Sequence, residues 1–276
     1  MSLKLNGPVV LAGAGKMGAS LLEGWIERGL DPASIIIQEP NLSGAALDLA
    51  NRHGIKAVAG NLSPLDRAPA VIVVAVKPQV MDDVFPALAK VSGPETVVIS
   101  IAAGKTLASF ERHLPPGTAV IRAMPNTPAA IGRGITGVVA NAHATAAQRE
   151  ACESLLGAVG EVVWVDDESL IDAVTAVSGS GPAYVFLLAE ALAEAGVAAG
   201  LDEATAKKLA RATVSGSGEL LNQSQTDPET LRRNVTSPGG TTAAALAVLM
   251  REGSGLKELM REAVLAAQKR GRELGR

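Results

Sequence analysis

Residues 8–28 read PVVLAGAGKMGASLLEGWIER, and this stretch decides the fold. A short apolar run, typical of a buried strand, leads into a glycine-rich turn, Gly13-Ala14-Gly15-Lys16-Met17-Gly18. Amphipathic spacing typical of a helix follows the turn to about Arg28. The glycines of a G-x-G-x-x-G turn permit a tight bend, close approach of the backbone to a pyrophosphate and close packing of helix on strand. The motif alone is weak evidence, but a strand before it and a helix after it favour dinucleotide binding.

The same alternation of strand-like and helix-like segments continues to about Val165. The β-branched runs are PVVLA, SIIIQ, AVIVVAV, TVVISIA, TAVIRAM, ITGVVA and EVVWV. Helical spacing is found at residues 16–28, 44–53, 79–90, 107–114 and 145–159. This alternation predicts an α/β fold with a doubly wound, mainly parallel sheet and helices on both faces. We therefore expect a Rossmann-type, dinucleotide-binding domain at residues 1–163.

From Asp166 onward the pattern is helical only. The expected breaks lie at residues 178–182, at Gly200, and at residues 226–228, 238–240 and 253–255. The chain is rich in alanine and leucine and contains only 2% aromatic residues, so extensive close packing of helices is expected. No Gly/Ser-rich or Pro-rich linker separates the halves. We expect an all-helical, substrate-binding and dimerisation domain at residues 164–276, entered directly from the last strand.

Composition and net charge limit the classes of binding partner that are expected. The formal net charge is −3 without a block of like charge, so neither nucleic acid nor an anionic membrane is favoured. No apolar run reaches the ~18 residues of a membrane span. Cys152 is the single cysteine, which excludes an intrachain disulfide and favours a reducing compartment. The opening MSLKLNGPVVLAGAG is interpreted as mature protein rather than a secretory signal. We expect a cytoplasmic protein acting on a small molecule.

Glu39 follows the second predicted strand, where a carboxylate can hold the ribose hydroxyls of the adenosine. A carboxylate at this point repels a 2′-phosphate, and no Arg or Lys follows until Arg52. Glu39 therefore favours NAD over NADP. The alternative is an exposed loop carboxylate, with Pro40 turning the backbone away.

Three further turns follow predicted strands. Since ligands of doubly wound sheets bind outside the carboxyl ends of the strands, these turns are candidates to line the cofactor. Prolines that end strands give similar sequences in any α/β protein, so one such turn is weak evidence for a cofactor site. The occurrence of three turns at one edge of the sheet strengthens it. The turns are Ala75-Val76-Lys77-Pro78, Ser100-Ile101-Ala102-Ala103-Gly104 and Met124-Pro125-Asn126-Thr127-Pro128.

A second glycine-rich segment lies in the helical half, where residues 231–250 read LRRNVTSPGGTTAAALAVLM. Gly239 and Gly240 precede a helix predicted to start near Thr241, and the first N–H groups of a helix have no partner inside it. Hydroxyls at Ser237, Thr241 and Thr242 lie at the same place. This arrangement favours a seat for a small anion. The alternative is an ordinary N-capped helix after a glycine pair. Another candidate loop, SGSGP at 178–182, is alternatively only a helix kink.

The residue types that are missing restrict the chemistry. His53, His113 and His143 have no spaced partners, so no metal site is predicted. There is no obvious His–carboxylate proton relay, nucleophile elbow or P-loop. The reaction should need little acid or base from the protein. Reduction of an imine that is already protonated fits this requirement.

Six segments occur in one order across nearly the whole chain: GAGKMG, AVKP, SIAAG, RAMPNTPA, SGSGPAYVF and LRRNVTSPGGTTAAALAVLM. Together they resemble pyrroline-5-carboxylate reductases. The first segment is shared by many dehydrogenases, and the last is highly specific. The resemblance implies hydride transfer from NADPH or NADH to 1-pyrroline-5-carboxylate, giving L-proline in the last step of proline biosynthesis. It also implies a homodimer through the helical domain, in some members part of a ring of dimers.

The resemblance also implies residue roles. Gly13, Gly15, Lys16, Met17 and Gly18 would bind the pyrophosphate, and Asn61, Ala75, Lys77, Ala102, Ala103 and Asn126 would line the cofactor cleft. Backbone N–H groups of Gly240, Thr241 and Thr242 would hold the substrate carboxylate, while the Thr242 hydroxyl, the catalytic group, faces the ring nitrogen. Glu168 matches a family position near the substrate; alternatively it is a helix N-terminal carboxylate. The family implies NADPH, but many members carry a hydroxyl or small polar residue in place of Glu39.

Other functions remain open at this point. Another NAD(P)-dependent imine reductase is one alternative. A β-hydroxyacid dehydrogenase would need a catalytic Lys in the first long helix of the second domain, and residues 166–201 contain none. A dinucleotide-sensing protein would oxidise no cofactor. A helical dimerisation module on a degenerate Rossmann fold would bind none.

Overall fold

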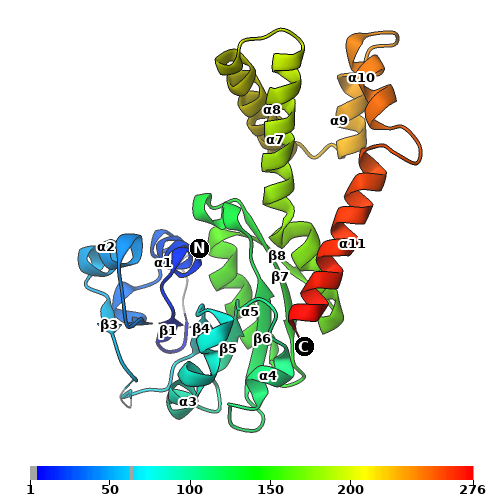
Figure 1. Ribbon diagram of the computed structural model, residues 1–276. Coiled ribbons are helices and arrows are strands. Elements are labelled where there is room, and N and C mark those ends of the chain that lie inside the picture. Colours follow the sequence, from blue (N-terminus) through cyan, green and yellow to red (C-terminus); the bar gives the residue numbers. More distant parts are fainter. Residues whose placement is uncertain (1–4, 63–64, 276) are drawn as a thin grey trace. The chain divides into compact units, whose positions relative to one another are not determined.

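The computed structural model describes residues 5–62 and 65–275 and divides into two compact units (Figure 1). The first unit runs to Gly179 and includes the last residues from Gln268, and the second unit is Ser180–Ala267. The boundary expected between residues 163 and 164 falls at the end of the last strand, so the helices at the start of the expected second domain are compact with the first unit.

One sheet of eight strands forms the centre of the first unit, counted over the described residues. The strand order is β3-β2-β1-β4-β5-β6-β7-β8, and all neighbours are parallel except β6 and β7. The order of the first six strands is that of a Rossmann fold, which confirms the predicted fold class. The strands are β1 (Val9–Ala12), β2 (Ile35–Gln38), β3 (Lys56–Val58), β4 (Val71–Val74), β5 (Val97–Ser100), β6 (Ala119–Met124), β7 (Gly134–Ala140) and β8 (Gly160–Trp164).

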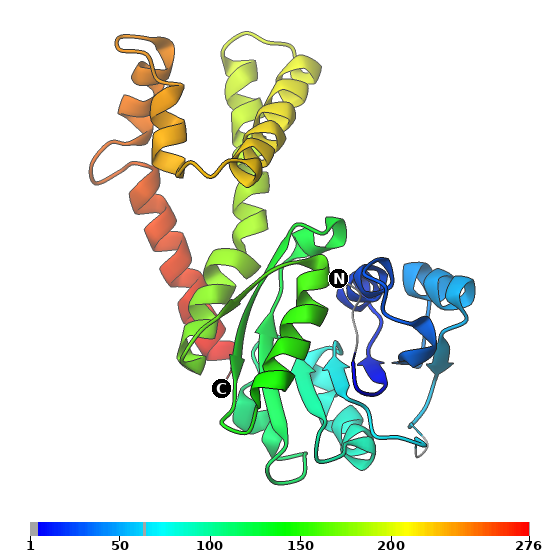
Figure 2. The same cartoon turned by 180° about the vertical axis from the view of Figure 1, so that it is seen from behind.

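Helices cover both faces of the sheet (Figures 1 and 2). On one face, α1 (Lys16–Glu27), α2 (Gly44–His53) and α5 (Ala146–Leu156) pack on alternate strand residues such as Val9 and Leu11. On the other, α3 (Met81–Val91) and α4 (Leu107–Glu111) pack on the intervening residues, such as Val10 and Ile72. Because both faces are buried, the strands read as continuous apolar runs. Trp25 of α1 is fully buried and donates its indole N–H to the Leu155 carbonyl of α5 at 2.9 Å.

The predicted helices and strands of the first unit are present, and one strand was missed. The five expected helices are observed within a few residues of their predicted ends. β3 was not predicted, because Lys56-Ala57-Val58 is not an apolar run and lies at the edge of the sheet, with Lys56 and Ala57 exposed.

The second unit is helical, as expected. It contains α7 (Gly181–Ala198), α8 (Glu203–Gln223), α9 (Pro228–Asn234), α10 (Thr241–Leu249) and the start of α11 (Leu256–Leu274). The predicted breaks at Gly200 and at residues 226–228, 238–240 and 253–255 separate these helices. At the break expected at 178–182, α6 (Ile171–Val174) continues into a π-helical turn, Thr175–Gly179, and α7 starts anew at Gly181 after a bend at Ser180. This wide turn is closer to the alternative of a kink.

Much apolar surface of the second unit is exposed. Phe186, Leu187 and Leu209 are 62%, 62% and 52% exposed, and the buried residues within α7 and α8 are all alanines, Ala193, Ala206 and Ala210. By length and composition alone, the helical run Glu168–Ala198 could cross a membrane, although polar and charged residues interrupt it and no apolar run within it reaches ~18 residues. One such helix is weak evidence for a membrane span. In soluble proteins, large exposed apolar patches commonly mark interaction sites.

Candidate active site

The glycine turn after β1 is built by three glycines in different ways. Gly13 has φ +91°, and a Cβ there would lie 2.7 Å from the Ala75 carbonyl carbon. A Cβ at Gly18 would lie 2.5 Å from the Gly13 carbonyl oxygen. A Cβ at Gly15, by contrast, would meet no described atom within 4 Å. Gly13 and Gly18 are therefore required by the fold, whereas Gly15 leaves open space at the N-terminus of α1.

That N-terminus can accept an anion. Gly15 is the N-cap residue of α1, and the first turn, as described, has neither a side-chain cap nor an acidic residue. Lys16 is exposed and Met17 is half-buried at the same turn. N–H groups at a helix start and the positive end of the helix dipole favour phosphate groups. The residues present thus fit a dinucleotide diphosphate.

Glu39 is joined to the glycine turn. Its Oε2 accepts the Ala14 N–H at 3.1 Å, and its Oε1 accepts the Asn41 N–H at 3.1 Å. The Glu39 N–H in turn donates to the Val58 carbonyl of β3 at 3.0 Å. The carboxylate is thus held over the turn, unlike the alternative in which Pro40 directs it away.

The carboxyl ends of the strands lie level at one edge of the sheet. The register pairs Ala12 with Gln38 and with Val74, and Ser100 pairs with both Val74 and Arg122. The turns that follow these strands therefore lie together. They carry most of the residues predicted to line the cofactor: the glycine turn, Glu39, Ala75, Val76, Lys77, Pro78, Ala102 and Ala103.

Asn61 and Asn126 approach this edge differently. The Gln38 side-chain amide donates to the Gly60 carbonyl at 3.4 Å, which ties the segment bearing the exposed Asn61 to the end of β2. Asn126 is buried after β6; its Nδ2 donates to the Ser178 carbonyl at 3.1 Å, and its Oδ1 accepts the Ile135 N–H at 2.9 Å. The Asn126 amide thus holds the β6–β7 connection and the π-helical turn.

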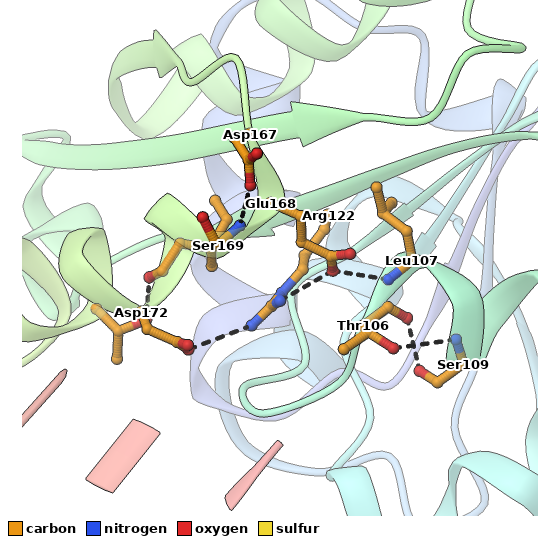
Figure 3. A network of polar contacts seen from close by, with 10 residues as sticks. Thr106, Leu107, Ser109, Arg122, Asp167, Glu168, Ser169 and Asp172 are labelled. Carbon is orange, nitrogen blue, oxygen red and sulfur yellow. Dashed lines mark hydrogen bonds and ion pairs between the residues drawn. The ribbon is translucent and has the colours of Figure 1, made fainter. Parts of the chain in front are cut away.

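Glu168 belongs to a polar network in the first unit (Figure 3). Its Oε1 accepts a hydrogen bond from Arg122 at 2.9 Å and another from the Leu107 N–H at 2.7 Å. Arg122 also lies 3.9 Å from Asp172. The neighbouring Asp167 accepts the Ser169 N–H, which lowers the pKa of the Asp167 carboxyl. Glu168 is therefore more than a helix N-terminal carboxylate, because it neutralises a buried arginine.

Arg122 was missed as a site residue at the sequence level. It lies in the strand Ala119–Met124, where its neighbours are apolar. A charged side chain inside such a run is buried only with partners, so this run contained a signal for a paired arginine.

The second unit carries the SPGGTT segment. Gly239 has φ +70°, and Gly240 is the extended N-cap residue of α10, which starts at Thr241 as predicted. Within the described residues, no side-chain hydrogen bond caps this helix. Ser237 and Thr241 are exposed and Thr242 is half-buried. The Gly240 N–H donates to the Ser237 carbonyl at 3.1 Å, so of the three N–H groups expected for a carboxylate, this one is used within the turn.

A recess of about 680 Å³ lies elsewhere, at the opposite edge of the sheet. Val71 and Val97, the first residues of β4 and β5, line it together with Thr145. It is remote from the glycine turn because parallel strands present their amino ends to one edge and their carboxyl ends to the other.

Comparison with known proteins identifies the family. The model of pyrroline-5-carboxylate reductase dimerisation matches residues 168–274, and that of coenzyme F420-dependent NADP oxidoreductases matches residues 8–104. The chain is 43% identical to the pyrroline-5-carboxylate reductase of Pseudomonas aeruginosa over 96% of each chain. It is also 43% identical to that of Synechocystis over 100% of each.

Solved structures agree. The pyrroline-5-carboxylate reductase of Coxiella burnetii has a TM-score of 0.89 at 36% identity, covering 98% of this chain and 99% of that one. The Plasmodium falciparum enzyme, solved with NADP bound, has a TM-score of 0.78 at 27% identity, covering 98% and 99%. These relatives match both the Rossmann half and the helical half. The chain therefore belongs to the pyrroline-5-carboxylate reductase family of NAD(P)-dependent oxidoreductases.

Proposed function

We propose that the chain reduces 1-pyrroline-5-carboxylate to L-proline with NAD(P)H, the last step of proline biosynthesis. The start of α10 is the observation that carries the substrate assignment, because it offers backbone N–H groups and threonine hydroxyls beside a glycine pair. A small carboxylate fits such a helix start. Family membership over the full chain supports the same reaction.

The first unit would hold the cofactor. The glycine turn, residues 13–18, would bind the diphosphate at the open side of Gly15, and Glu39 would face the adenosine ribose. Asn61, residues 75–78, Ala102, Ala103 and Asn126 would line the rest of the cleft. When bound, the reduced nicotinamide supplies a hydride.

The SPGGTT segment would hold the substrate. The N–H groups of Thr241 and Thr242 are available for the carboxylate, with Ser237, Gly239 and Gly240 shaping the turn. The Thr242 hydroxyl accepts a hydrogen bond from the protonated ring nitrogen, so the imine carbon needs no further acid from the protein. Fixing that carbon about 3 to 3.5 Å from the hydride donor contributes several kcal/mol to lowering the barrier.

The decisive experiment measures initial rates of proline formation with NADH and NADPH in parallel. We expect Thr242→Ala to lower kcat/KM about a hundredfold, and Thr242→Ser to restore most of it, with dinucleotide affinity unchanged. Thr241→Ala is the matched control, since it keeps the backbone N–H and should cost less than about tenfold. Equal loss of dinucleotide affinity in Thr242→Ala would contradict the role of Thr242. No wild-type activity with either cofactor would contradict the function.

Within this function, we propose that NADH is preferred over NADPH. The Glu39 carboxylate is fixed over the glycine turn, and a 2′-phosphate about 5 Å from it would be repelled by about 3 kcal/mol per pair of unit charges at an effective dielectric constant near 20. Glu39→Ser should therefore raise kcat/KM for NADPH relative to NADH by about tenfold or more. An unchanged ratio would show that Glu39 does not set the preference.

We propose further that the chain acts as a cytoplasmic homodimer, with a ring of dimers as the larger assembly. The exposed apolar residues of α7 and α8 support this interface, and residues 164–276 would form the dimerising, substrate-binding domain. A partner chain covering this surface also accounts for the apolar helix without a membrane, and the net charge of −3 leaves nucleic acid unfavoured. Sedimentation at low micromolar concentration should give a mass of two chains or an even multiple; a stable monomer would contradict the proposal.

A further inference from the structure

A buried arginine couples two distant segments of the first unit. Arg122 lies on β6 with its side chain 7% exposed. Val120, two residues earlier on the same face of the strand, packs in the cluster that includes Phe110 of α4, so Arg122 faces the α4 side of the sheet. A buried guanidinium requires carboxylate partners, and Glu168 and Asp172 supply them.

The same Glu168 oxygen holds the loop between β5 and α4. Besides Arg122, Glu168 Oε1 accepts the N–H of Leu107, the first residue of α4, at 2.7 Å (Figure 3). The other end of this loop is held where Ser100 Oγ accepts the Ala102 N–H at 3.3 Å. The loop thus has an anchor at each end. Ala102 and Ala103 lie close to the Ser100 anchor, and Leu107 is held at the Glu168 anchor.

The end of α11 packs beside the same loop and network. A Cβ at Gly104 would lie 3.4 Å from the Leu274 carbonyl oxygen, and a Cβ at Gly271 would lie 3.3 Å from Asp172 Oδ1. Both contacts are within the first unit. The C-terminal residues of α11 therefore bound the loop on this side as well.

We infer that Arg122 and Glu168 form a positioning pair that sets the loop 101–106 for the cofactor, and that Glu168 acts on the reaction through the Leu107 N–H rather than by binding substrate. This rests on the proposed function in one respect, that Ala102 and Ala103 line the dinucleotide. Oε1 of Glu168 is already shared between two donors, one of them a buried cation. That commitment favours a role through the loop over a role as substrate ligand.

The experiment compares Glu168→Ala with Glu168→Gln. The glutamine keeps an oxygen for the Leu107 N–H, whereas alanine removes it. NADH and NADPH are titrated by calorimetry without substrate, and KM for 1-pyrroline-5-carboxylate is then measured at saturating dinucleotide. We expect Glu168→Ala to weaken dinucleotide binding about tenfold, with KM for the imine changed less than about twofold, and Glu168→Gln to recover at least half of the loss on a logarithmic scale.

Two further variants complete the design. Ser100→Ala loosens the loop at its other end while leaving the Arg122 network intact, and it should weaken dinucleotide binding in the same direction. Glu161→Gln, at an exposed position of β8, is the matched charge-removal control and should change nothing.

A raised KM for the imine in both Glu168 variants, with unchanged dinucleotide affinity, would overturn the inference in favour of a substrate ligand. A lowered Tm with unchanged dinucleotide affinity would overturn it in favour of a purely structural network. If Glu168→Ala does not fold, the inference is tested with Glu168→Gln and Ser100→Ala. Unchanged dinucleotide affinity in Ser100→Ala then overturns the inference. Since dinucleotide binding is measured without turnover, failure of the proposed reaction is seen separately, in the wild-type rates.

Discussion

Replacement of Gly15 by alanine should separate ligand binding from folding. A Cβ at Gly15 meets no described atom within 4 Å, and the backbone angles, φ −68° and ψ −166°, are open to alanine. Loss of a glycine N-cap costs roughly 0.5 to 1 kcal/mol, and the smaller conformational entropy of the unfolded chain returns about 0.4 to 1 kcal/mol. The two terms offset each other, so the free energy of unfolding should be unchanged within about 1 kcal/mol.

Gly18→Ala is the contrasting variant. Its Cβ would lie 2.5 Å from the Gly13 carbonyl oxygen, so backbone must move, at about 1 to 3 kcal/mol. At about 2 to 4 °C per kcal/mol for a chain of this size, its Tm should fall by roughly 2 to 12 °C.

The assay pairs calorimetric titration of NADH with thermal unfolding. In Gly15→Ala the new methyl group occupies the space proposed for the diphosphate, so Kd should rise about tenfold or more, equivalent to about 1.4 kcal/mol, at an unchanged Tm. Wild-type affinity in Gly15→Ala would refute the assignment of this space to the cofactor. A large fall in its Tm would refute the reading of the local geometry.

Three further predictions concern stability and reactivity. In Gly137→Ala the new Cβ would lie 2.4 Å from Val174 Cγ1, so the free energy of unfolding should fall by about 1 to 3 kcal/mol. Adding Val174→Ala should recover part of this loss, as measured by thermal unfolding. Burial raises the pKa of the Cys152 thiol, so a disulfide reagent at pH 8 should leave the native protein unlabelled and label one thiol per chain after unfolding; rapid native labelling would contradict this. Asp202 is hydrogen-bonded by the side chain and N–H of Thr205, and Asp227 by the N–H and side chain of Thr230, which lowers the pKa of each carboxyl below its ordinary 3.8. Their stabilisation is complete above that value and is lost as pH falls through the lowered pKa, so acid titration by circular dichroism should show helix loss that Asn at both positions reduces.

Much of the fold could be predicted because its determinants are local. A strand buried on both faces must be apolar along its length, and the glycine turn identifies which strand comes first. β3 was not predicted because it is an edge strand. Lys56-Ala57-Val58 pairs with one neighbouring strand only and is largely exposed, so its sequence need not be an apolar run. The break at 178–182 was predicted, but the π-helical turn of residues 175–179 that leads into it was not, because glycine signals only an interruption and not its form.

The candidate site was predictable where topology alone places residues. The turns after β1, β2, β4 and β5 meet because parallel strands in register end together. The partners of Glu168 were beyond reach, since its contacts with Leu107 and Arg122 span 61 and 46 residues of sequence. Two further hydrogen bonds could not be predicted, because they depend on three-dimensional geometry. The Asn126 amide bonds to the backbone of the fold, and the Gly240 N–H donates within its own turn.

The exposed leucines and phenylalanine of α7 and α8 have a thermodynamic consequence. If this surface is buried only on association, folding of the unit is coupled to association. The midpoint of its thermal unfolding then depends on protein concentration. Dilution should lower the melting temperature of the helical unit. For the dimer proposed above, the quantity of chain that a cell makes thus becomes one of the determinants of its stability.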